Sequence, residues 1–269
     1  MERRTTHRAG LGRLAAHYFR FNLSANMAYS SSFLIQVFGM ALNNSAFVVF
    51  WLVLFERIGG DIAGYSFQNV MFLWSVAASG VGLAVVVFGN AHMLSHVIYT
   101  GGLDVFLLQP KPVLPNVVMS RMIVAGWGDF AYGIILFVLT QPLSFAGVAL
   151  FLLFTILMAF VYSAIRVIYH CISFYAGNAE TFANLAGEMI ITFMIYPGSI
   201  FKGPSAWILH SLIPAAIVAY IPSRIFTRFD PGLLAIVIGA DAAIVAIAFL
   251  LFRLGLRKYE SGNLIGTRM

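Results

Sequence analysis

Two histidines, His92 and His96, stand four residues apart in the stretch HMLSHVIYTGGLDVFLLQPKP and are the first candidates for metal chemistry. At this spacing both imidazole rings lie on one face of a helix, as in a two-histidine zinc site. A hydrolytic zinc site also needs a general base and a third ligand. No Glu follows His92, and no third ligand stands nearby in the sequence. We therefore favour an interfacial histidine pair over a metal site.

Three acidic residues, Asp129, Glu188 and Asp241, lie in stretches apolar enough to reach membrane depth. An ionised group at that depth is costly and often functional, so these acids could line the proton path of a proton-coupled secondary transporter. Arg121 precedes Asp129 by eight positions and so falls on a roughly similar helix face. We favour structural pairing with arginines. No internal repeat of the kind that secondary transporters show is evident.

Catalytic motifs do not stand out in the chain. The phosphate-binding pattern G-x-x-x-x-G-K-[ST] does not occur, so no ATP site of that type is expected in this polypeptide. The G-x-S-x-G pattern of serine hydrolases does not occur either, which leaves a membrane-embedded enzyme as the weakest alternative. The single cysteine, Cys171, excludes an internal disulfide. We expect neither catalytic residues, nor a metal, nor a cofactor bound by this chain.

Composition indicates the environment in which the chain folds. Of the 269 residues, 61% are hydrophobic and 10% are charged, and the mean hydropathy is +0.90. Soluble domains carry about 25% charged residues. The apolar runs are long and do not alternate, and a backbone in lipid must satisfy its hydrogen bonds within each helix or in a closed barrel. The sequence therefore predicts an all-α, polytopic membrane protein.

The apolar runs divide the chain into three expected regions. Residues 1–26 form a basic, amphipathic helix at the membrane interface, residues 27–252 a six-span transmembrane domain, and residues 253–269 a tail. The expected spans comprise residues 27–55, 66–90, 114–140, 145–169, 182–201 and 232–252.

Two segments between spans are unusual. Residues 92–112 interrupt the apolar sequence with a short helical stretch, the pair Gly101-Gly102 and a Pro-Lys-Pro end. Residues 203–223 carry no charge but contain three prolines. Because proline removes a backbone donor and breaks a helix, we interpret 203–223 as a re-entrant helical hairpin rather than a full crossing.

The basic residues orient the six spans. With both termini in the cytoplasm, twelve Lys and Arg residues lie on the inner side and four on the outer side, and an excess of positive charge inside is the usual arrangement. The inner residues are Arg3, Arg4, Arg8, Arg13, Arg20, Lys111, Arg121, Arg166, Arg253, Arg257, Lys258 and Arg268, and the outer ones are Arg57, Lys202, Arg224 and Arg228. The charge distribution thus reports topology, and we expect no nucleic-acid partner. The 92–112 segment is then cytoplasmic.

Three stretches together carry a resemblance to a known family. They are YTGGLDVFLLQP at 99–110, the stretch that begins YPGSIF at 196 and runs through Pro214 to Pro222, and GLRKYESGN at 255–263. In order and spacing the chain resembles the transmembrane permease of type-2 ABC exporters, in a branch of uncharacterised six-span permeases. The resemblance covers essentially the whole chain.

The resemblance implies a division of labour with separate subunits. In such permeases the loop between spans two and three is a coupling helix that docks on an ATPase, and the segment between spans five and six closes the outer end. Two permeases and two ATPase subunits form the working unit, and the ATPase binds ATP and Mg. The implied coupling residues are His96, Tyr99, Thr100, Gly101, Gly102, Leu103, Asp104, Phe106 and Leu107. The implied outer-gate residues are Tyr196, Pro197, Phe201, Pro214 and Pro222.

The resemblance also implies a location and leaves two points open. We expect a multi-pass protein of the bacterial inner membrane that contacts lipids. The second permease is either an identical copy or a paralogue. The substrate path, lined by bulky apolar side chains of spans one, two and five, is compatible with lipids, drugs, peptides or lipid-linked glycans.

Overall fold

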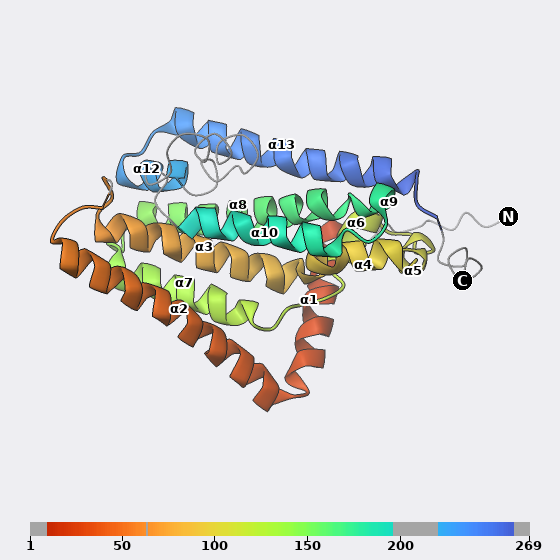
Figure 1. Cartoon of the computed structure of the whole chain (residues 1–269), viewed down its shortest axis with the longest axis horizontal. Helices are drawn as coiled ribbons and strands as arrows, with labels where there is room; N and C mark the ends of the chain where they lie inside the picture. The colour runs from red at the N-terminus through yellow and green to blue at the C-terminus, as the bar shows by residue number, and fades with distance from the viewer. Residues whose placement is uncertain (1–9, 63, 196–219, 261–269) are drawn as a thin grey trace.

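The computed structural model describes residues 10–62, 64–195 and 220–260 (Figure 1). The regular secondary structure of this part of the chain is helical apart from a single bridge between Ile62 and Tyr65. The all-α prediction is confirmed for the described residues. The helices are α1 (Leu11–Met27), α2 (Ser30–Ile58), α3 (Phe67–Val87), the 3-10 helix η1 (Gly89–Met93), α4 (Leu94–Tyr99), α5 (Asp104–Leu107), α6 (Val113–Val118), α7 (Gly126–Thr140), α8 (Phe145–His170), α9 (Ser173–Ala176), α10 (Glu180–Ile195), α12 (Ile221–Thr227) and α13 (Pro231–Leu256).

Among the described residues, four helical segments are long and apolar enough to cross a membrane. These are α2, α3, α8 together with α9, and α13. They match four of the expected spans. Helices α7 and α10 are shorter, with 15 and 16 residues, so at 1.5 Å per residue each extends for less than the roughly 30 Å of a bilayer core. Most of the expected hairpin at 203–223 lies outside the described residues, as does the end of the fifth expected span.

The third expected span is not one helix. Residues 114–140, uniformly apolar in sequence, form α6 and α7 with a non-helical connection between them. In that connection the backbone N–H of Ile123 donates to the Val85 carbonyl of α3 at 3.0 Å. A Cβ added to Gly89 would lie 2.8 Å from the Arg121 carbonyl oxygen, so the connection also runs close against the end of α3. At the interruption, one backbone N–H thus bonds to α3 instead of within its own helix.

Side-chain caps begin three of the long helices. The Ser66 hydroxyl accepts from the Asn69 N–H at the start of α3, and the Ser144 hydroxyl accepts from the Gly147 N–H at the start of α8. At α13, Asp230 accepts from two backbone N–H groups and is followed by proline. These caps satisfy donors that the first turn leaves unpaired, which fixes the helix starts.

Helix α3 is the centre of the bundle, and 15 of its 21 residues are buried. It approaches α7 closely because small residues face each other. A Cβ on Gly133 would lie 2.5 Å from the Ser79 nitrogen and 2.6 Å from the Ser75 carbonyl. The Ser79 and Thr155 hydroxyls, 3.0 Å apart, connect α3 to α8. Small residues and buried hydroxyls are the usual means of helix association in lipid.

Helices α2 and α13 occupy the outside of the bundle. Figure 1 shows α13 along α8 on one side, and α2 diverging from α7 on the other. Both leave most of their residues exposed, and those residues are largely apolar. An exposed apolar helix face fits lipid or a partner membrane helix.

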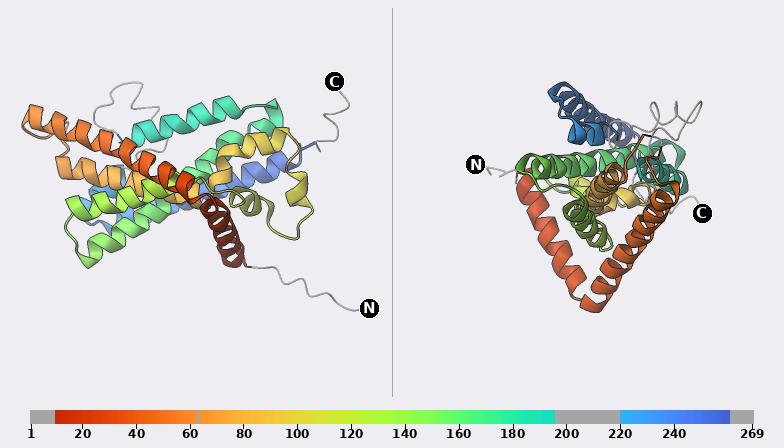
Figure 2. Two further views of the ribbon diagram at one scale, coloured as in Figure 1. Left: turned by 90° about the horizontal axis from the view of Figure 1, so that it is seen from below. Right: turned by 90° about the vertical axis from the view of Figure 1, so that its left-hand side faces the viewer.

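Helix α1 lies steeply across the bundle and forms a V with α2 (Figure 2). The Tyr18 hydroxyl donates to Asn116 Oδ1 at 2.7 Å, and the Asn22 amide donates to the Met119 carbonyl at 3.1 Å. Burial raises the pKa of Tyr18 above its usual 10.0, so the phenol keeps its proton for this bond. These bonds attach α1 to the end of α6.

Candidate functional site

The 92–112 segment forms η1, α4 and α5, three short helices at the end of the bundle where α8 ends and α10 begins (Figure 1). Between α4 and α5 the chain reverses at Gly101, whose φ of 79° is in the left-handed region that favours glycine. At Gly102, a Cβ would lie 3.2 Å from the Val97 carbonyl. The Thr100 hydroxyl donates to the His96 carbonyl at 2.6 Å and closes α4. The Gly-Gly pair is therefore required by a tight turn.

The inner face of the segment is an apolar core shared with the long helices. Leu94 and Leu103 are fully buried, and Ile98 is nearly so. They belong to one cluster with residues at the ends of α8 and α13, among them Val167 and Phe252. The segment is therefore bound to the long helices by packed side chains.

Polar contacts connect the same segment to three other parts of the chain. The Ser95 N–H donates to His170 Nδ1 of α8 at 3.1 Å. The Tyr259 hydroxyl, beyond the end of α13, donates to Asp104 Oδ1 at 2.9 Å. Burial, and then this bond to Asp104, raises the pKa of Tyr259 to about 12.

His96 makes the third polar contact and lies 3.8 Å from Glu180 at the start of α10. Its Nδ1 is also 2.9 Å from the Tyr99 hydroxyl. The two histidines of the sequence motif have different surroundings, since His92 lies beneath the segment and faces α8. Among the described residues no group of three or more metal-ligating side chains includes either of them.

The outer face of the segment is apolar and exposed. Leu108 is 88% exposed, Val105 64% and Leu107 43%, while Phe106 is half-buried. Leu103, which the sequence groups with Phe106 and Leu107, points instead into the core. The apolar part of the surface that a partner could contact therefore consists of Val105, Leu107 and Leu108, and the exposed His96 and Thr100 add polar groups to that surface.

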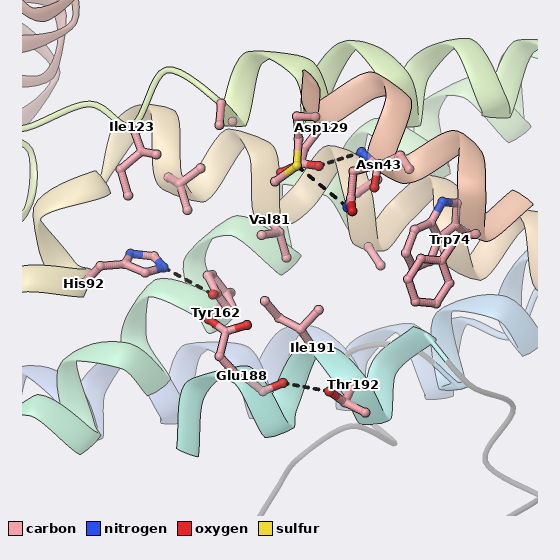
Figure 3. Close-up of a pocket in the computed structure, with 18 residues that line it drawn as sticks. Asn43, Trp74, Val81, His92, Ile123, Asp129, Tyr162, Glu188, Ile191 and Thr192 are labelled. Carbon is pink, nitrogen blue, oxygen red and sulfur yellow. Dashed lines mark hydrogen bonds between the residues drawn. The ribbon is translucent and has the colours of Figure 1, made fainter. Parts of the chain in front are cut away.

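A cavity of about 430 Å³ lies in the bundle, on the inner side of the segment (Figure 3). Side chains of α2, α3, α7, α8 and α10 form its walls, and His92 of η1 lies at one end. His92 Nε2 is 3.2 Å from the Tyr162 hydroxyl. Burial, with smaller contributions from Arg166 and His170, lowers the pKa of His92 to about 3, so this ring is neutral at physiological pH.

Two of the three acids in the apolar stretches line this cavity. Asp129 of α7 accepts a hydrogen bond from the Asn44 amide of α2 at 2.6 Å. Glu188 of α10 lies 4.0 Å from Arg166 of α8, which also donates to Asn184 Oδ1 at 2.5 Å. The expected pairing with arginine is thus found for Glu188, whereas the partner of Asp129 is a neutral amide.

Comparison with known proteins decides the family. The family model described as ABC-2 family transporter protein matches residues 41–263, which is well over half of the chain. The chain belongs to this family. No curated protein and no solved structure matches it.

The family assigns a general role to the permease. ABC-2 permeases are multi-pass membrane components of ABC transporters, they associate with ABC ATPase subunits, and they are not themselves catalytic. The matched region includes the 92–112 segment and every lining residue of the cavity except Met40. The resemblance that the sequence motifs suggested is confirmed.

Of the expected outer-gate residues of the permease, four lie outside the described residues: Tyr196, Pro197, Phe201 and Pro214. Pro222 is buried in the first turn of α12. There it lines a small cavity with Asp241 of α13. This carboxylate is buried and lies apart from the larger cavity.

Sequence reasoning missed the Asn44–Asp129 pair and the cavity around it. The available signal was the pair of amides, Asn43 and Asn44, in the middle of an otherwise apolar span. Such amides in a membrane helix indicate a contact with another helix. The sequence does not reveal which helix supplies the partner.

Proposed function

We propose that this permease is the membrane-spanning subunit of an ATP-driven exporter and that its 92–112 segment docks on a separate ATPase. The observation that carries the proposal is the two-sided character of the segment. Leu94 and Leu103 are buried against the long helices, whereas Val105 and Leu108 are exposed on the outer face. Exposed apolar side chains outside the lipid are typical of protein interaction sites.

In the proposed topology the chain crosses the membrane six times with both termini in the cytoplasm. The six crossings are α2, α3, the pair α6 and α7, α8, the 182–201 segment that contains most of α10, and α13. Residues 203–223 form an outer re-entrant hairpin in this proposal. The amphipathic helix lies within residues 1–26, and residues 253–269 form the tail. The excess of basic residues on the proposed inner side supports this orientation. The bacterial inner membrane is the proposed location, as the resemblance implied.

The proposed transmission follows the contacts of the segment. Closure of the ATPase subunits displaces α4 and α5. Because Leu103 and Ile98 share a core with α8 and α13, the displacement is passed to those helices, and the Tyr259–Asp104 bond makes the end of α13 follow. Packed interfaces shift between discrete arrangements, so a small movement at the segment can tilt whole helices. The tilt opens the substrate path.

The proposed complex contains two permeases and two ATPase subunits, and the ATPases bind ATP and Mg. The exposed apolar faces of α2 and α13 support packing against a second permease or lipid. That second permease is an identical copy or a paralogue. The proposed outer gate includes Pro222 and the residues at 196, 197, 201 and 214.

The test is affinity purification of the tagged permease, followed by identification of the recovered subunits. We expect an ATPase that carries a phosphate-binding loop in a fixed ratio to the permease. Leu108→Asp is expected to remove it, because this substitution places a charge on the docking face without disturbing the core. Leu143→Asp, at an exposed leucine in the α7–α8 turn, is the matched control. An active preparation without any ATPase would refute the proposal.

A further inference from the structure

The cavity between α2, α3, α7, α8 and α10 is of a size suited to one organic molecule. Its volume of about 430 Å³ falls within the roughly 300–1,000 Å³ range of small-molecule sites. Most of the lining is apolar, with a few polar groups concentrated on α2, α7 and α10. The charge and the aromatic rings of this lining indicate the ligand class that it fits, a conclusion that rests on the proposed transport function.

The cavity has a negative character. The described residues that line it include Asp129 and Glu188 but neither Lys nor Arg. Figure 3 shows Asp129 on the wall formed by α7 and Glu188 on the opposite wall formed by α10. Glu188 is 66% exposed in its side chain and has Arg166 at 4.0 Å, so its charge is partly balanced.

The charge of Asp129 is not balanced in this way. This residue is 8% exposed, and Oδ1 accepts from the neutral Asn44 amide. In the part of the chain that the structure describes, Oδ2 accepts no hydrogen bond and no cation forms an ion pair with the carboxylate. A buried carboxylate with one free oxygen is costly unless it takes up a proton or a positive group approaches it. The cavity therefore provides one strong position for a single positive charge.

Aromatic rings form much of the remaining wall. Trp74 of α3 stacks on Phe47 of α2 with ring centroids 4.9 Å apart, and Tyr162 of α8 lies further along the cavity (Figure 3). The faces of such rings attract alkylated ammonium groups. Apolar side chains such as Val81 and Ile191 complete the lining and fit an apolar body.

We propose that this cavity binds an amphipathic, monovalent organic cation, with the charge at Asp129 and the apolar body against Trp74 and Tyr162. A metal ion fits poorly, because hard cations require several oxygen ligands and the described residues contain no group of three or more ligating side chains. An anion is disfavoured by the two carboxylates and by the absence of a lining Lys or Arg among the described residues. The same ligand chemistry is found in free organic amines and in amine headgroups of lipids.

The test uses two probes of the same shape and opposite charge, tetraphenylphosphonium and tetraphenylborate. Binding of the radiolabelled probes to the full-length permease in dodecyl maltoside micelles, which carry no charged headgroup, is measured by equilibrium dialysis, with excess unlabelled probe to define displaceable binding. We expect displaceable binding of the cation, and none of the anion. If the natural source is a lipid headgroup, phosphatidylethanolamine or phosphatidylcholine added to the micelles will compete with the cation. If the source is a free amine, neither lipid will compete.

Asp129→Asn removes the charge and keeps the size of the side chain. We expect cation binding about 30-fold weaker or more, as when one partner of a buried charge pair is truncated. Asp241→Asn is the matched control, because Asp241 is also buried in a membrane helix but lines a different cavity. The Asp241→Asn permease should bind tetraphenylphosphonium with the affinity of the wild type.

A second variant guards against misfolding of the first. Asn43→Lys places a positive charge at an exposed position beside Asn44 on the cavity wall and should abolish cation binding. Gln36→Lys, also at an exposed position of α2 but not among the lining residues, should not. The proposal is overturned if the folded permease shows no displaceable cation binding, if both probes bind alike, or if neither Asp129→Asn nor Asn43→Lys weakens binding. None of these results depends on an ATPase, so each leaves the exporter assignment to its own test.

Discussion

Two leucines of the 92–112 segment provide a sharp test of its two-sided character. Leu103 is fully buried in the core shared with α8 and α13, whereas Leu108 is 88% exposed. The same substitution, Leu→Ala, is therefore expected to have different consequences at the two positions. At Leu103 it affects folding, and at Leu108 it affects association with the ATPase.

The expected magnitudes follow from the burial. Truncation of a fully buried leucine costs about 2–5 kcal/mol, through lost apolar contacts and the cavity left behind. Truncation at an exposed site usually changes stability by less than about 0.5 kcal/mol. If Leu108 contacts the ATPase, its loss should cost about 1–2 kcal/mol of binding, a roughly five- to thirtyfold increase in Kd.

Two assays separate these effects. Unfolding of the purified permease by SDS titration, followed by tryptophan fluorescence, gives the change in stability. Binding of the purified ATPase to permease in nanodiscs gives the change in Kd. We expect Leu103→Ala to lower stability, and Leu108→Ala to weaken ATPase binding at unchanged stability. Equal unfolding curves for Leu103→Ala and the wild type, or a loss of stability in Leu108→Ala, would refute the assignment of inner and outer faces.

Three further predictions concern the contacts that hold the bundle. Tyr259→Phe removes the hydrogen bond to Asp104 and should cost about 1 kcal/mol, seen as faster hydrogen exchange in α5. Burial and Asp104 raise the pKa of Tyr259 from 10.0 to about 12. The stabilisation is therefore complete below pH 10 and is lost as the pH rises through 12. The free energies of unfolding of the wild type and of Tyr259→Phe should converge over that interval. Gly133→Leu forces α3 and α7 apart and should abolish monodisperse expression. Gly39→Leu should not, because no atom lies within 4 Å of the added Cβ. Similar size-exclusion profiles for the two variants would contradict the close packing of α3 against α7. Cys171, which is 4% exposed, should react with maleimide only after unfolding in SDS, and rapid labelling of the native permease would show that the end of α8 is open.

The long helices were predictable from composition, because an apolar run of 20 or more residues has few alternatives in lipid. Helices α2, α3, α8 and α13 follow the apolar runs, and the starts of α3, α8 and α13 coincide with the capping residues Ser66, Ser144 and Asp230. The interruption at 119–125 was not predictable. At this interruption the Ile123 N–H bonds to the Val85 carbonyl, a contact between distant residues that leaves no mark in local hydropathy.

In the candidate sites, too, local features were predictable from the sequence and contacts between distant residues were not. The glycine turn at Gly101 was evident in the sequence, because two adjacent glycines between short apolar stretches predict a reversal. The burial of Leu103 was not evident, since helices of four to six residues are too short to show which face is inside. The Tyr259–Asp104 bond joins residues 155 positions apart, and no local pattern predicts such a contact.

The central claim is that the exposed face of the 92–112 segment contacts an ATPase. The most direct measurement is site-specific photo-cross-linking in intact cells, with a photoreactive amino acid at position 108 and, as control, at position 143 in the α7–α8 turn. The account predicts an adduct at 108 whose partner carries a phosphate-binding loop, and no such adduct at 143. An active transporter that forms no ATPase adduct at 108, or that forms it equally at 143, would contradict the account.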